Sequence, residues 1–117
     1  MVDIYKVGNT SDCIQLSVKI GTTGGASTIV LISGELVAKS NHAGCIQNHT
    51  LGVASNLIGK TMEICTQISK LETSKHTTNY CLSGGACGTV QYDKEDNTLS
   101  SDDGSLVHVT KYIEFVA

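Results

Sequence analysis

The chain has 117 residues, of which 40% are hydrophobic and 16% are charged, and its formal net charge at pH 7 is −3. This length and apolar content exclude a disordered chain, and they fit one domain that folds without a metal or a disulfide. The sequence contains no Arg and no Trp, which together with the negative charge excludes the basic stripe and stacking aromatics typical of nucleic-acid binders.

The N-terminal residues predict no targeting signal. Residues 1–6 include an acid and lack an apolar h-region, so no secretory signal is expected. The longest fully apolar run, residues 29–32, is far shorter than the roughly 18 residues of a membrane span. We therefore expect a soluble cytoplasmic protein with neither membrane nor nucleic acid as a partner, and a processed secreted form stays open as an alternative.

A two-residue period predicts the first strands. Between residues 13 and 20 polar and apolar side chains alternate strictly, which is typical of a half-buried strand, and its inner face comprises Ile14, Leu16, Val18 and Ile20. After a Gly-rich turn at residues 21–25, residues 27–32 are apolar on both faces, as expected for a central strand. Gly34 then allows a tight hairpin into residues 35–39.

The middle of the chain is less regular. Residues 40–52 are polar, with a short strand predicted near residues 45–47. Residues 61–69 alternate again, although Ile64, Ile68 and Leu71 also fit helical spacing. We favour a strand here because β-branched side chains are stiff at χ1 and fit a pleated surface better.

Further strands are predicted at residues 78–82, 88–92 and 106–116, with an acidic loop at residues 93–104 before the last one. Val107, Val109, Ile113 and Phe115 share one face of the last strand, and His108 lies on the other. Short strands about ten residues apart, joined by Gly, Asn and Asp turns, are typical of sandwiches and small barrels. The sequence thus predicts one all-β domain over residues 1–117, either a single antiparallel β-sandwich of jelly-roll or immunoglobulin-like type or a small barrel, with about seven to nine strands.

Five cysteines occur in the chain. An odd number without an export signal favours free thiols in a reducing compartment, and the residues are Cys13, Cys45, Cys65, Cys81 and Cys87. A hairpin disulfide between Cys81 and Cys87 stays open, because its Cα separation cannot be read from the sequence.

One polar segment resembles a metal motif in its spacing. His42, Cys45 and His49 stand at H-x2-C-x3-H intervals, and imidazole and thiolate are ligands that suit Zn²⁺. Cys81, Cys87 or water would be the fourth ligand. The alternative is a surface loop with two solvated histidines and one buried thiol.

Two further motif matches are weak. Residues 54–61 fit a relaxed phosphate-binding loop with Ala54 in place of its first Gly, but the segment lacks a Gly-rich cradle and a parallel α/β context, so we prefer a turn at Gly59 that leads into a strand. The acidic loop at residues 93–104 suggests a loop Ca²⁺ site as an alternative. It lacks the Gly and Glu that an EF-hand requires, and a solvated loop is the preferred interpretation.

No motif predicts a catalytic centre or a bound cofactor. The favoured hypothesis is a non-catalytic binding or assembly module that acts through a sheet edge, a sheet face or loops, with a protein partner or a second copy of the chain. The first alternative is a Zn-stabilised domain or a thiol- or metal-dependent enzyme centred on His42, Cys45 and His49. The second alternative is a glycan- or small-ligand-binding β-sandwich that uses its Gly-rich loops and Tyr side chains.

Overall fold

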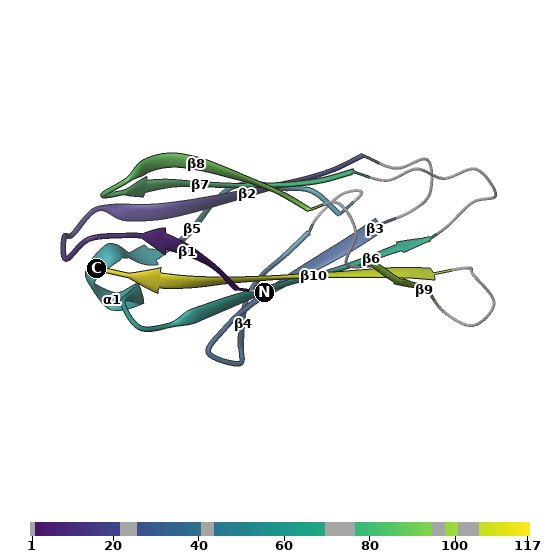
Figure 1. Ribbon diagram of the computed structural model, residues 1–117, viewed down its shortest axis with the longest axis horizontal. Helices are drawn as coiled ribbons and strands as arrows, with labels where there is room; N and C mark the ends of the chain where they lie inside the picture. The colour runs from purple at the N-terminus through teal and green to yellow at the C-terminus, as the bar shows by residue number, and fades with distance from the viewer. Residues whose placement is uncertain (1, 22–25, 41–43, 70–76, 95–97, 101–105) are drawn as a thin grey trace.

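Two β-sheets lie face to face and enclose the hydrophobic core between them (Figure 1). The computed structural model describes residues 2–21, 26–40, 44–69, 77–94, 98–100 and 106–117. The described elements are strands apart from one short helix. The predicted all-β class is therefore confirmed, with a sandwich-like arrangement of two layers. When the three-residue strand β9 is set aside, the described strands number nine, the upper end of the expected range.

The first sheet, sheet A, has six strands in the order β1-β10-β6-β3-β4, with β9 also paired to β10. Their bounds are β1 Val2–Lys6, β3 Ala26–Ile32, β4 Glu35–Lys39, β6 Thr61–Ser69, β9 Thr98–Ser100 and β10 Leu106–Val116. Strand β1 runs parallel to β10, and the other pairs are antiparallel. The expectation of a purely antiparallel sandwich is wrong at this edge, because the chain returns from the second sheet and ends beside its own first strand.

The second sheet, sheet B, has four antiparallel strands in the order β5-β2-β7-β8. Their bounds are β2 Cys13–Gly21, β5 Ile46–Val53, β7 Thr77–Gly85 and β8 Gly88–Lys94. Helix α1, Ala54–Leu57, follows β5 directly and leads the chain from sheet B to β6 in sheet A. It buries Ala54 and Leu57 against the core.

The predicted inner face of β2 is confirmed, since its four apolar side chains are all buried. The strand prediction for residues 61–69 is also confirmed, and β6 pairs with both β3 and β10. In β10, Val109, Ile113 and Phe115 are buried as expected, but Lys111 lies on the same inner face and is buried with them. That face is therefore apolar except for one cation.

Several expectations are corrected. Strand β5 continues to Val53, well beyond the predicted residues 45–47, because its pairing with β2 extends to that residue through two register shifts that interrupt a regular alternation. Strands β1 and β9 and helix α1 were not predicted. Strand β3 pairs with both β6 and β4, as expected of a central strand, but Ile29 on its outer face remains 40% exposed. The inner side of β3 packs against sheet B, and its outer side faces away from the core (Figure 1).

Candidate functional site

Two residues of the predicted metal motif, Cys45 and His49, make hydrogen bonds with the backbone. His42 lies outside the described residues. The Sγ of Cys45 accepts a hydrogen bond from the backbone N–H of Ile20 at 3.5 Å. Nε2 of His49, in β5, donates to the carbonyl oxygen of Val37, in β4, at 3.0 Å. Across the described parts of the chain, no three His, Cys, Asp or Glu side chains are grouped so that they could hold a metal ion.

The segment that resembled a phosphate-binding loop forms a turn that leads into a strand. A phosphate-binding loop places a helix after its Gly-Lys-Thr, whereas here the four-residue helix α1 comes before Gly59 and β6 starts at Thr61. Gly59 has a φ of +83°, and its N–H donates to the carbonyl of Phe115 at 2.9 Å. The preferred turn is confirmed.

The proposed loop Ca²⁺ site rests mainly on residues 95–97 and 101–105, which lie outside the described residues.

None of the five cysteines forms a disulfide, so the hairpin disulfide between Cys81 and Cys87 is absent. Cys13 and Cys87 are exposed, and the other three are half-buried. Burial, followed by the negative charge of Glu63, raises the pKa of the Cys65 thiol. A raised pKa keeps the thiol protonated and makes it a poor nucleophile, so Cys65 does not support the thiol-enzyme hypothesis.

The outer side of sheet A carries a set of exposed apolar side chains, which we call the apolar face. Among the described residues these are the large hydrophobic side chains with the highest exposure, between 40% and 59%: Val2, Ile4, Ile29, Leu36 and Tyr112. They come from β1, β3, β4 and β10, which are all strands of sheet A. Among the described residues, sheet A therefore exposes large apolar side chains and sheet B does not.

The strand register places part of the apolar face in one row. Val2 pairs with Tyr112, Tyr112 pairs with Glu63, and Glu63 pairs with Leu31, which in turn pairs with Leu36. Glu63, by hydrogen bonding and by its charge, raises the pKa of Tyr112. The row is thus apolar along both edges of the sheet, with one carboxylate at its centre.

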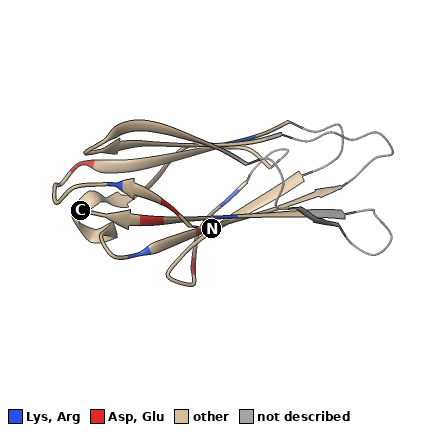
Figure 2. Ribbon diagram, viewed as in Figure 1, with Lys and Arg blue, Asp and Glu red and all other residues tan. Residues whose placement is uncertain are grey.

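Beside this row lies a shallow cavity of about 330 Å³, whose lining includes Ile29, Cys65 and His108. His108 alternates along β10 with the buried Val109 and so lies on the outer side, as the sequence predicted. Charged positions are distributed over both sheets, and Figure 2 shows no continuous basic stripe along the described strands.

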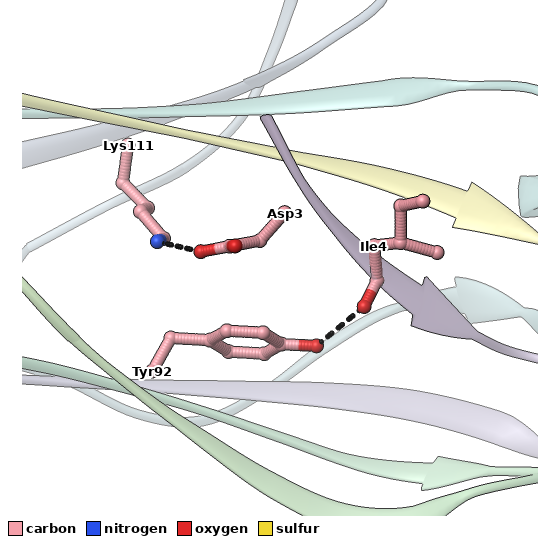
Figure 3. Close-up of polar contacts among 4 residues, drawn as sticks. All are labelled: Asp3, Ile4, Tyr92 and Lys111. Carbon is pink, nitrogen blue, oxygen red and sulfur yellow. Dashed lines mark hydrogen bonds and ion pairs between the residues drawn. The ribbon is translucent and has the colours of Figure 1, made fainter. Parts of the chain in front are cut away.

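A second group of residues lies in the interior, between the sheet edges formed by β1 and β8. This interior charge cluster consists of Asp3, Tyr92 and Lys111 (Figure 3). The Lys111 side chain is 7% exposed and forms an ion pair with Asp3, whose side chain is 37% exposed. The Lys111 Nζ also lies 5.5 Å from the centroid of the Tyr92 ring, within the range of a cation–π contact.

Two tyrosine hydroxyls connect β1 to the opposite sheet. Tyr92 in β8 donates to the carbonyl of Ile4 at 2.9 Å. Tyr5 in β1 donates to the carbonyl of Gly88 at 2.6 Å and accepts from the N–H of Gly85 at 2.9 Å. These bonds fix the spacing between β1 and the β7–β8 hairpin, where the interior charge cluster lies.

The sequence contained a signal for this cluster. Lys111 interrupts an inner face that otherwise reads Val109, Ile113 and Phe115, and Asp3 alternates with the buried Tyr5. A charged residue at an inward position of a strand is rare unless it has a partner. The alternation in the sequence identified the inner face of the last strand, but only the fold showed that the first strand lies beside it.

Within the described part of the chain, no helix combines the length and apolar character needed to cross a membrane. The chain matches no protein-family model, no curated protein and no solved structure.

Proposed function

We propose that the chain is a non-catalytic binding or assembly module that associates with a second copy of itself or with another protein through the apolar face. The observation that carries this proposal is the gathering of Val2, Ile4, Ile29, Leu36 and Tyr112 on the outer side of one sheet. Contiguous exposed apolar surface is uncommon on monomers and marks interaction sites. The finer fold assignment, jelly-roll or immunoglobulin-like, stays a prediction that accompanies this proposal.

Burial of the apolar face would supply the free energy of association. Removing apolar surface from water contributes about 25 cal/mol per Å², and aromatic anchors such as Tyr112 are frequent at the centres of interfaces. Strand β4 is one edge of sheet A, and an added strand can pair along such an edge. On β1, the other edge, the carbonyls of Ile4 and Lys6 already accept hydrogen bonds from the β7–β8 hairpin of sheet B. Glu63, in the middle of the row, favours a partner that presents a cation or a hydrogen-bond donor there.

The test is light scattering coupled to size exclusion over a concentration series. We expect the mass of the wild-type protein to rise with concentration, and we expect Leu36→Lys and Tyr112→Lys to remain monomeric. Thr89→Lys and Gln91→Lys, at exposed positions of β8 in sheet B, are matched controls that should associate as the wild type does.

If the wild-type protein is a monomer, chemical cross-linking in its native extract should yield adducts that Tyr112→Lys lacks and Thr89→Lys keeps. A monomer whose adducts are the same in all variants would contradict the proposal.

A small-ligand or glycan site is the second candidate, and a cavity of about 420 Å³ on sheet B favours it. Its lining includes Ser17, Lys19, Gln47 and Asn48. Ser17 Oγ donates to the side-chain oxygen of Asn48 at 3.1 Å, so polar groups converge there. Glycan-array binding that Asn48→Ala removes would support this function, and an array without hits would argue against it.

A further inference from the structure

The interior charge cluster places an amine and a carboxylate in contact within an apolar layer. Lys111 is flanked on its own strand by the buried Val109 and Ile113, and its register partner on β6 is Ile64, which is also buried. Asp3 lies on the adjacent parallel strand, opposite Ile113. The two side chains thus reach each other diagonally across neighbouring strands, and Figure 3 shows the Lys111 Nζ directed at an Asp3 oxygen.

The Lys111 end of this ion pair is poorly solvated, because 7% of that side chain is exposed, whereas 37% of the Asp3 side chain is exposed. A buried ion pair repays its desolvation only with good geometry and further hydrogen bonds to its remaining donors and acceptors. The described contacts of the Lys111 Nζ are one Asp3 oxygen and the Tyr92 ring. Burial of Lys111 disfavours its charged form. The same burial would therefore favour a reaction that removes the charges of both Lys111 and Asp3.

We propose that Lys111 and Asp3 condense to an intramolecular isopeptide bond that joins the last strand covalently to the first. A proton passes from the ammonium to the carboxylate, and the Nζ lone pair then attacks Cγ of Asp3. The Nζ–Cγ bond forms and one Cγ–Oδ bond breaks. The departing oxygen leaves as water with two of the three ammonium protons, so atoms and charge balance and nothing is oxidised or reduced.

The fold supplies what this reaction needs. A desolvated lysine amine is a competent nucleophile, and well-oriented reacting groups reach effective concentrations of roughly 10⁵–10⁸ M. The Tyr92 ring lies beside Nζ and is itself fixed by its hydrogen bond to Ile4. The partial exposure of Asp3 leaves a route by which the released water reaches solvent.

The cross-link goes beyond the proposed function. It would close a covalent loop from residue 3 to residue 111, so that β1 could not separate from β10. Strand β1 carries Val2 and Ile4 of the apolar face, and it would stay in place under mechanical load or protease attack.

Intact-mass measurement of the denatured wild-type protein tests the proposal. We expect a mass lower than that of the sequence by one water molecule, and a branched peptide after digestion that contains both Asp3 and Lys111. Lys111→Met and Asp3→Ala should show their full sequence masses, whereas Lys19→Met, which removes an exposed lysine of β2, should keep the loss.

Two results would overturn the proposal. One is a wild-type protein that keeps its full sequence mass after prolonged incubation in the folded state. The other is a water loss that maps to Asp103–Gly104, where an Asp-Gly sequence can cyclise to a succinimide without Lys111. Both results are read from the wild-type protein, so they stay interpretable even where a variant fails to fold.

Discussion

At the scale of single residues, Tyr5 contacts both sheets. Its hydroxyl donates to the carbonyl of Gly88 and accepts from the N–H of Gly85. Its ring packs edge-on against Phe115, with centroids 6.4 Å apart and an interplanar angle of 83°. One side chain therefore joins β1 to the hairpin of the other sheet and to β10 beside it. Polar groups at the tip and apolar packing along the ring make Tyr suited to this position.

Replacing Tyr5 with Phe keeps the ring and removes both hydrogen bonds. We expect the free energy of unfolding to fall by about 1–3 kcal/mol, because the Gly88 carbonyl and the Gly85 N–H lose their partner. Urea unfolding followed by circular dichroism measures the change. Tyr112→Phe, at an exposed position of β10, is the control and should change stability by less than about 0.5 kcal/mol. Equal effects in the two variants would contradict the role assigned to Tyr5.

At the scale of elements, the approach of β7 to β2 depends on Gly84. This residue has a φ of +94°, and a Cβ added to it would collide with the carbonyl oxygen of Cys13. The β7–β8 register shifts between Leu82 and Gly85, so the hairpin bends where the backbones come closest. Glycine is needed here both for its conformation and for the absence of a side chain.

A pair of Gly→Ala substitutions separates these two requirements. Gly34, in the β3–β4 turn, has a φ of +84° and open space around it, so Gly34→Ala should cost about 1–2 kcal/mol of backbone strain. Gly84→Ala adds a backbone collision to the same strain and should cost clearly more. Denaturant midpoints compared at equal m-values measure the difference. A Gly84→Ala protein as stable as Gly34→Ala would show that β7 does not approach β2 so closely.

At the scale of the whole molecule, the two sheets share one core, to which both contribute buried side chains. Burial, with smaller effects from the charges of Cys87, Asp3 and Tyr5, raises the pKa of Tyr92 to about 12 from 10.0. Burial likewise raises the pKa values of Tyr5 and Tyr80. Ionising any of these phenols would place a negative charge between or beside the sheets.

The alkaline stability of the protein follows from these shifts. The folded state holds the phenol proton more tightly than the unfolded state, so the stabilisation is complete below pH 10 and is lost as the pH rises from 10 to about 12. We expect the free energy of unfolding to fall across that interval in urea titrations at fixed pH. Tyr92→Phe should have a shallower slope, and an unchanged slope would contradict the assignment.

A shared core also predicts one cooperative unfolding transition for residues 1–117 as a single domain. Near-ultraviolet and far-ultraviolet circular dichroism should give the same thermal midpoint. The Lys111→Met variant is measured beside the wild type, because it cannot form the proposed bond to Asp3. Two resolved transitions in the variant would show that the sheets unfold separately.

The sequence by itself determined the local pattern. The alternation from Cys13 to Ile20, the β-branched residues of 61–69 and the bounds of 106–116 were all predicted and found as strands, because the period of two is a property of adjacent residues. Only the tertiary structure decided that β1 lies parallel to β10 and that Asp3 meets Lys111. Strand pairing depends on contacts between residues far apart in the chain, and several pairings are compatible with the same alternation. For the same reason the apolar face on sheet A emerged only when the strands were placed side by side.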